Sequence, residues 1–71
     1  MIYHDRMRGL REDNDLTQTH VAKVLGVAQT TYSQYELNQR SMPIEYLIKL
    51  CEFYNVSADY MLGFSNNKKH P

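Results

Sequence analysis

Amides and hydroxyls without any neighbouring charge are concentrated in one short stretch, at Gln29, Thr30, Thr31, Ser33 and Gln34. A glutamine can form two hydrogen bonds with adenine, and serine or threonine can bond to several bases, so direct reading of base edges needs side chains of this kind. An ordinary solvated helix surface can have the same composition. Composition alone favours that second interpretation.

The overall charge of the chain argues against a nucleic-acid partner, because Lys plus Arg and Asp plus Glu each total 8. Proteins that neutralise phosphates usually show an excess of basic residues. The distribution is less unfavourable, since residues 16–40 contain Lys23 and Arg40 against Glu36. Other carboxylates lie farther along the chain, at Glu45, Glu52 and Asp59. Neutrality therefore permits DNA binding with few phosphate ion pairs and predicts modest non-specific affinity.

No set of residues has the spacing of a catalytic or metal site. His4, His20 and Cys51 are scattered, and no glycine-rich loop is present to hold a phosphate. We therefore expect no enzyme activity, no catalytic residue, no metal and no cofactor. The lone Cys51 lies among apolar residues, which indicates a buried thiol in a reducing cytoplasm. We expect no membrane span and no signal peptide, because no apolar run approaches about 20 residues.

Apolar residues recur at helical spacing and predict the elements that must position the polar stretch. Tyr3, Met7 and Leu10 predict a first helix that ends near residues 13–14. Thr17 is a good N-cap for a second helix, and Gly26 stops it. A third helix follows over residues 29–36, with only Tyr32 and Tyr35 as apolar anchors, and Asn38 ends it by adopting a left-handed conformation.

Two more helices complete the predicted fold. Pro43 suits the first turn of a fourth helix, whose broad apolar face comprises Ile44, Leu47, Ile48, Leu50, Cys51 and Tyr54. Ser57 caps a short fifth helix that carries Tyr60, Met61 and Leu62 and ends at Gly63. A chain of 71 residues forms one domain at most. The sequence thus predicts an all-α bundle of five helices over residues 1–64 and a polar, frayed C-terminal tail over residues 65–71.

Several motifs in register resemble the phage repressor and Cro-type (Xre-like) helix-turn-helix family. They are Leu16-Thr17-Gln18, Val21-Ala22, Leu25-Gly26-Val27, Tyr32-Ser33, Tyr35-Glu36, Asn38-Gln39-Arg40, Pro43 to Leu50 and Asn55 to Gly63. The resemblance, from Arg6 to Gly63, implies a lambda-repressor-like bundle whose second and third helices form the helix-turn-helix. It also implies a sequence-specific, repressor-like transcription regulator that reads the DNA major groove with the third helix.

The resemblance assigns roles to individual positions. Gln18 matches a residue that holds a phosphate, and Gln29 and Thr30 match residues that face base edges. Ser33 and Gln34, one turn further, match positions that reach bases or the adjacent phosphate. Further members of the expected interface are Ala28, Thr31 and Arg40, the last of which resembles a backbone contact. Arg11 and Glu36 match an ion pair between the first and third helices; two independent surface charges are the alternative.

The sequence departs from the family pattern at four positions. Where Ala28 stands, the family often has serine or threonine, so the third helix lacks an N-cap and a phosphate donor. Asp15 and Asn38 occupy positions where glycine is usual, and both can adopt positive φ at some cost. His20 replaces the acidic residue of a capping box, which weakens that cap. We expect His20 to be an ordinary solvated side chain.

The expected partner is double-stranded DNA, with a near-palindromic operator and a homodimer. The fourth and fifth helices would form the dimer surface, with Phe53, Met61 and Phe64. The alternative is a protein-interaction module, or the antitoxin-type partner of a toxin, with the same fold. Among the tyrosines we assign Tyr32, Tyr54 and Tyr60 to the core and leave the remaining three unassigned: Tyr3, Tyr35 and Tyr46.

Overall fold

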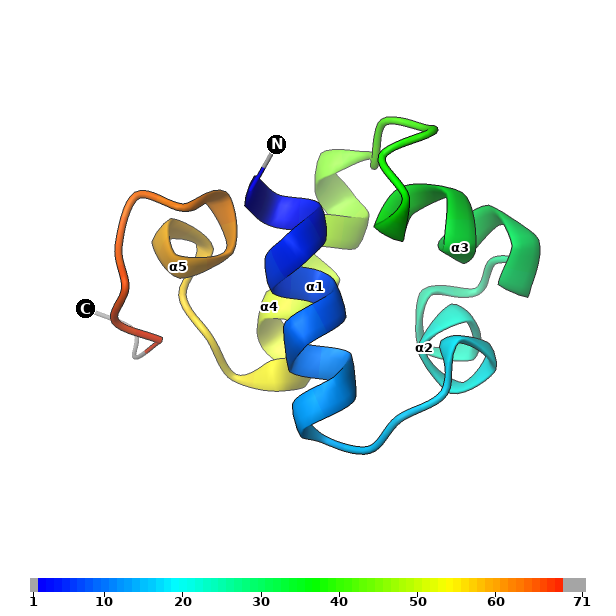
Figure 1. Ribbon diagram of the computed structural model, residues 1–71, viewed down its shortest axis with the longest axis horizontal. Helices are drawn as coiled ribbons and strands as arrows, with labels where there is room; N and C mark the ends of the chain where they lie inside the picture. Colours follow the sequence, from blue (N-terminus) through cyan, green and yellow to red (C-terminus); the bar gives the residue numbers. More distant parts are fainter. Residues whose placement is uncertain (1, 69–71) are drawn as a thin grey trace.

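A computed structural model describes residues 2–68 of the protein (Figure 1). Within that range it has five helices and no strand: α1 (Ile2–Asp13), α2 (Gln18–Leu25), α3 (Gln29–Glu36), α4 (Ile44–Tyr54) and α5 (Ala58–Leu62). In Figure 1, α5 lies on one side of α1 and the α2–α3 pair lies on the other. The predicted all-α bundle with a helix-turn-helix is confirmed. None of the described helices is long and apolar enough to cross a membrane.

Local side-chain chemistry sets the helix ends as the sequence predicts. The Thr17 hydroxyl accepts a hydrogen bond from the His20 amide at 3.0 Å, and Gly26 ends α2 with a φ of 75°. Asp15 and Asn38 adopt φ values of 55° and 57° in the turns after α1 and α3. A short polar side chain lowers the cost of this left-handed conformation for a residue other than glycine. The turns around the helix-turn-helix therefore fold without the family's usual glycines.

The core draws on all five helices and on the turn before α5. Its buried apolar residues are Met7, Leu10, Val21, Ala22, Leu25, Tyr32, Tyr35, Leu47, Leu50, Cys51, Val56 and Met61. Tyr35, which we left unassigned, is buried, whereas Tyr54 and Tyr60 are only half-buried.

Three of the sequence predictions about burial are wrong. Ile44 and Ile48 are 61% and 50% exposed, because α4 turns the stripe formed by Leu47, Leu50 and Cys51 toward the core instead. Met61 is fully buried and does not form part of any surface for a second copy. The same helical spacing that marks a core face thus included residues at its solvent-exposed edge.

The first part of the polar tail is packed against the domain. The Ser57 amide donates to the Lys68 carbonyl at 2.9 Å, and Arg6 Nη2 donates to Asn66 Oδ1 at 3.1 Å. The Arg6 guanidinium also lies over the Tyr60 ring, 4.1 Å from its centroid. These contacts connect the tail, as far as Lys68, to α1 and to the start of α5. Residues 69–71 lie outside the described residues.

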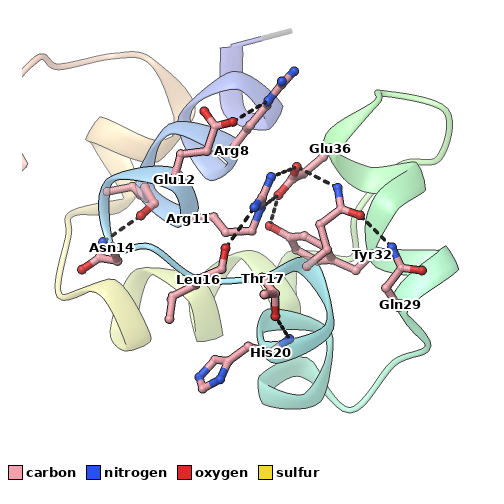
Figure 2. Close-up of polar contacts among 12 residues, drawn as sticks. Arg8, Arg11, Glu12, Asn14, Leu16, Thr17, His20, Gln29, Tyr32 and Glu36 are labelled. Atoms are coloured by element: carbon pink, nitrogen blue, oxygen red, sulfur yellow. Dashed lines mark hydrogen bonds and ion pairs between the residues drawn. The ribbon is translucent and has the colours of Figure 1, made fainter.

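A shielded ion pair joins α1 to α3. Arg11 Nε donates to Glu36 Oε2 at 2.7 Å, and Arg11 Nη2 donates to Glu36 Oε1 at 3.1 Å (Figure 2). The third guanidinium nitrogen, Nη1, donates to the Leu16 carbonyl at 3.0 Å. The side chains of Arg11 and Glu36 are 15% and 2% exposed. Such a bidentate pair fixes the angle between the two groups, and hence the setting of α3 against α1.

The Glu36 carboxylate stays ionised although it is buried. Burial alone would raise its pKa, but hydrogen bonds from Arg11, Tyr32 and Gln18 outweigh that effect and hold the pKa below its usual value. The Tyr32 hydroxyl donates to Glu36 Oε2 from one turn earlier on α3. Burial, together with this bond to the carboxylate, raises the pKa of Tyr32, so the hydroxyl keeps its proton and remains a donor.

We predict that Ala28→Ser stabilises the domain. Ala28 already has the extended backbone of an N-cap, with φ −68° and ψ 152°, but offers no side-chain acceptor to the first amides of α3. A serine cap is worth about 0.5–2 kcal/mol over alanine. Urea unfolding would measure the gain, with Ala58→Ser, at the first residue of α5, as a matched control expected to change little. An unchanged or lower midpoint for Ala28→Ser would contradict the assigned start of α3.

We predict that Glu36→Gln lowers the free energy of unfolding by about 3 kcal/mol, since removing one partner leaves the shielded Arg11 charge uncompensated. Arg11→Met combined with Glu36→Leu should recover only part of this loss, because the buried Tyr32 hydroxyl then loses its acceptor. Adding Tyr32→Phe should recover more. A double-mutant cycle on unfolding free energies measures the Arg11–Glu36 coupling; a coupling of zero would mean that the pair does not contribute to folding.

Candidate nucleic-acid interface

The polar stretch identified in the sequence lies on the outer side of α3. Tyr32 and Tyr35 point into the core, which leaves Gln29 and Thr30 exposed at the start of the helix. The other members of the stretch are half-exposed: Thr31, Ser33 and Gln34. Helix α3 therefore presents amides and hydroxyls to solvent, and its tyrosines anchor it from behind.

Two glutamines that open successive helices meet at this surface. Gln18 is the first residue of α2 and Gln29 is the first residue of α3. Gln29 Nε2 donates to Gln18 Oε1 at 2.7 Å, and Gln18 Nε2 donates to Glu36 Oε1 at 3.1 Å. Figure 2 shows Gln29, Glu36 and Arg11 joined by this chain of contacts. The ion pair inside the domain is thereby connected to a side chain on its surface.

The resemblance paired Arg11 with Glu36 but connected Gln18 and Gln29 neither to each other nor to that pair. It assigned Gln18 to a phosphate and the charged pair to the fold, whereas the structure gives Gln18 one hydrogen bond to Glu36 and one to Gln29. Tyr32 was assigned only to the core, yet its hydroxyl is a partner of the carboxylate. Tyr32 lies four residues before Glu36 on the same helix, and side chains at this spacing are neighbours, so the sequence contained a signal for this bond.

Other predicted members of the interface lie around this centre. Ala28 is exposed and leaves the first amides of α3 without a side-chain cap. Uncapped amides and the positive end of the helix dipole favour an anion at this position. Arg40 is exposed in the loop that follows α3, and His20 is exposed on α2. The structure thus brings Gln18 and Ala28 close to Gln29, while Arg40 lies beyond the opposite end of α3.

The electrostatics of this side of the domain are less neutral than the composition implies. Glu36 is the only acidic residue in the sequence from residue 16 to residue 40, and Arg11 compensates its charge. Lys23 and Arg40 are exposed in the same stretch. Exposed carboxylates lie on α4 and α5, at Glu45, Glu52 and Asp59. A modest positive excess therefore remains near α2 and α3.

The side chains around Gln29 are suited to hydrogen bonding with a ligand at the surface of the domain. Within residues 2–68 no pocket is formed, and no three His, Cys, Asp or Glu side chains come together as metal ligands would. The side chains gathered around Gln29 offer donors, acceptors and uncapped helix amides on an open surface. Phosphate oxygens and base edges are ligands that such groups recognise.

Comparison with known proteins gives consistent matches. A helix-turn-helix family model matches residues 7–61. YobD of Bacillus subtilis (strain 168), an uncharacterized HTH-type transcriptional regulator, is 35% identical over 66 residues, which are 93% of this chain and 59% of YobD. The cryptic phage CTXphi transcriptional repressor RstR of Vibrio cholerae is 38% identical over 55 residues, 78% of this chain and 50% of RstR.

Antitoxin PezA of Streptococcus pneumoniae serotype 4 is 33% identical over 57 residues, 80% of this chain and 36% of PezA. The chain spans roughly half the length of YobD and RstR. No solved structure is a significant match. The family match runs from α1 into α5 and contains the complete α2–α3 pair with its glutamine contact. The chain belongs to the phage repressor and Cro-type (Xre-like) helix-turn-helix family.

Proposed function

We propose that the protein is a sequence-specific DNA-binding transcription regulator of the repressor type, which places α3 in the major groove. The observation that carries the proposal is the position of Gln29. It lies exposed at the N-terminal end of α3, and Gln18 holds its amide at 2.7 Å. In helix-turn-helix proteins the N-terminal residues of the second helix contact base edges. A side chain held before binding loses less rotamer freedom when it meets a base.

Other residues have complementary roles in this proposal. Thr30, Ser33 and Gln34 face bases or the adjacent DNA backbone. Thr31 belongs to the same interface. Phosphates are held by the second amide hydrogen of Gln18, by the uncapped amides after Ala28 and by Arg40. These contacts are mostly neutral hydrogen bonds. They fix the register of α3 without requiring a strongly basic surface.

We further propose that a homodimer binds a near-palindromic operator, since a two-fold protein matches two half-sites. Phe53 on α4 and Phe64 after α5 are 41% and 80% exposed, and we assign them to the contact between copies. The buried, free Cys51 supports action in the reducing cytoplasm.

The similarity to antitoxin PezA supports a second candidate, in which the protein also binds a toxin. The two candidates share DNA binding and differ in the protein partner. Toxin binding would need a surface distinct from α3, and co-purification of one stoichiometric partner from the native host would favour it.

We predict that Gln29→Ala reduces sequence preference more than non-specific affinity. A bidentate pair between glutamine and adenine contributes about 1–3 kcal/mol of discrimination. Binding curves on a site selected from random DNA and on scrambled DNA measure both quantities. Gln39→Ala, which removes an exposed glutamine outside the contact chain, is the control and should keep the preference. An equal loss of affinity on both DNAs would contradict base reading by Gln29.

The proposed interface also predicts a shallow salt dependence. With Lys23 and Arg40 as the exposed cations of residues 16–40, about two phosphates are neutralised per monomer, and the slope of log K against log salt should be roughly −2. Titrations at several salt concentrations give this slope, and Arg40→Gln should make it less steep by about 1. A slope near −8 per monomer would show that a different, more basic surface binds DNA.

A further inference from the structure

The contacts between Glu36, Gln18 and Gln29 have a defined direction. An ionised carboxylate can only accept hydrogen bonds, whereas a glutamine amide offers an acceptor at one end and two donor hydrogens at the other. Gln18 therefore has to turn its nitrogen toward Glu36 and its carbonyl oxygen toward Gln29, as it does. Gln29 must then give one amide hydrogen to Gln18. Its own carbonyl oxygen and its second hydrogen remain for a ligand.

The free carbonyl oxygen and the second amide hydrogen of Gln29 can distinguish adenine from guanine. In the major groove adenine offers a donor at N6 and an acceptor at N7, whereas guanine offers acceptors at both N7 and O6. A Gln29 amide with its oxygen available matches adenine. With the amide reversed, its oxygen would face Gln18 and its NH2 group would face the base, which matches guanine.

We infer that Glu36, a residue that touches no base, sets the base preference of Gln29 by orienting the Gln18 amide. Glu36 is a positioning residue in this scheme, and the inference rests on the proposed base reading by Gln29. The carboxylate is suited to the role because it is 2% exposed and Arg11 holds both its oxygens. Gln18 thus meets a fixed acceptor, and the orientation of its amide is set before DNA arrives.

The substitution Glu36→Gln should reverse the direction of the chain. Oε2 accepts the shorter bonds, from Arg11 Nε at 2.7 Å and from the Tyr32 hydroxyl, whereas Arg11 Nη2 and Gln18 both donate to Oε1 at 3.1 Å. We therefore expect the single carbonyl oxygen of a glutamine at position 36 to take the place of Oε2 and to leave Arg11 Nη2 without this acceptor. The NH2 group of that glutamine then replaces Oε1 and faces Gln18. Two donors cannot pair, so the Gln18 amide turns over, and the Gln29 amide turns over in response.

The experiment compares the affinity for adenine and for guanine at the base pair that Gln29 reads. Sites are selected from random DNA with the natural protein, and Gln29→Ala identifies the base pair whose preference depends on Gln29. Adenine-over-guanine affinity ratios are then measured for Glu36→Gln and for Gln18→Met. The charge-matched control is Glu45→Gln, which removes an exposed carboxylate in the first turn of α4.

We expect Glu36→Gln to lower the adenine-over-guanine ratio about tenfold, within the range that one bidentate pair supports. Gln18→Met should lower the ratio less, because it frees the Gln29 amide without reversing it, and the control should leave it unchanged. A merely structural role of Glu36 would weaken binding to both sites equally and keep the ratio.

Gln18→Met keeps the test decisive if Glu36→Gln does not fold. Gln18 is half-exposed, and its removal leaves the Arg11 and Tyr32 bonds to Glu36 in place. An unchanged ratio in every folded variant, with the preference lost in Gln29→Ala, would overturn the inference and leave base reading intact. If Gln29→Ala changes no base preference, base reading itself is overturned, and the inference with it.

Discussion

The arrangement of the helix-turn-helix depends on one buried carboxylate. Glu36, at the end of α3, accepts hydrogen bonds from Arg11 on α1, Gln18 on α2 and Tyr32 on α3 itself. Its charge is costly to bury and is tolerated because donors from three helices surround it. The same requirement constrains those helices, since each must bring its donor to a single point. Stability and the setting of α3 are therefore properties of one polar cluster.

Much of the fold was predictable because local chemistry sets it. Thr17, Gly26 and Asn38 mark helix ends through hydrogen bonds and backbone conformations that each residue type favours on its own. Burial at the edge of a helix face was not predictable in the same way. Ile44 and Ile48 were misplaced because helical spacing defines a stripe but not which side of it meets a neighbouring helix.

The candidate site was predictable in its members but not in its connections. The resemblance named Gln18 and Gln29 separately, and their 2.7 Å contact depends on how α2 packs on α3. That packing is a tertiary property, which no spacing along the chain expresses. The zero net charge was misleading for a related reason, since a sum over the chain does not express that Glu45, Glu52 and Asp59 lie on α4 and α5.

The start of α3 at Ala28 has a consequence for local motion. The first amides of α3 have no side-chain acceptor, and the first turn has the contact of the Gln29 side chain with Gln18 but no cap. Such a turn opens at a lower free energy than the rest of the helix, so its amides should exchange hydrogen quickly. An anion bound there would close the turn. The amides after Ala28 would then lose their fast exchange when a phosphate binds, while the contact with Gln18 holds the Gln29 side chain before and after binding.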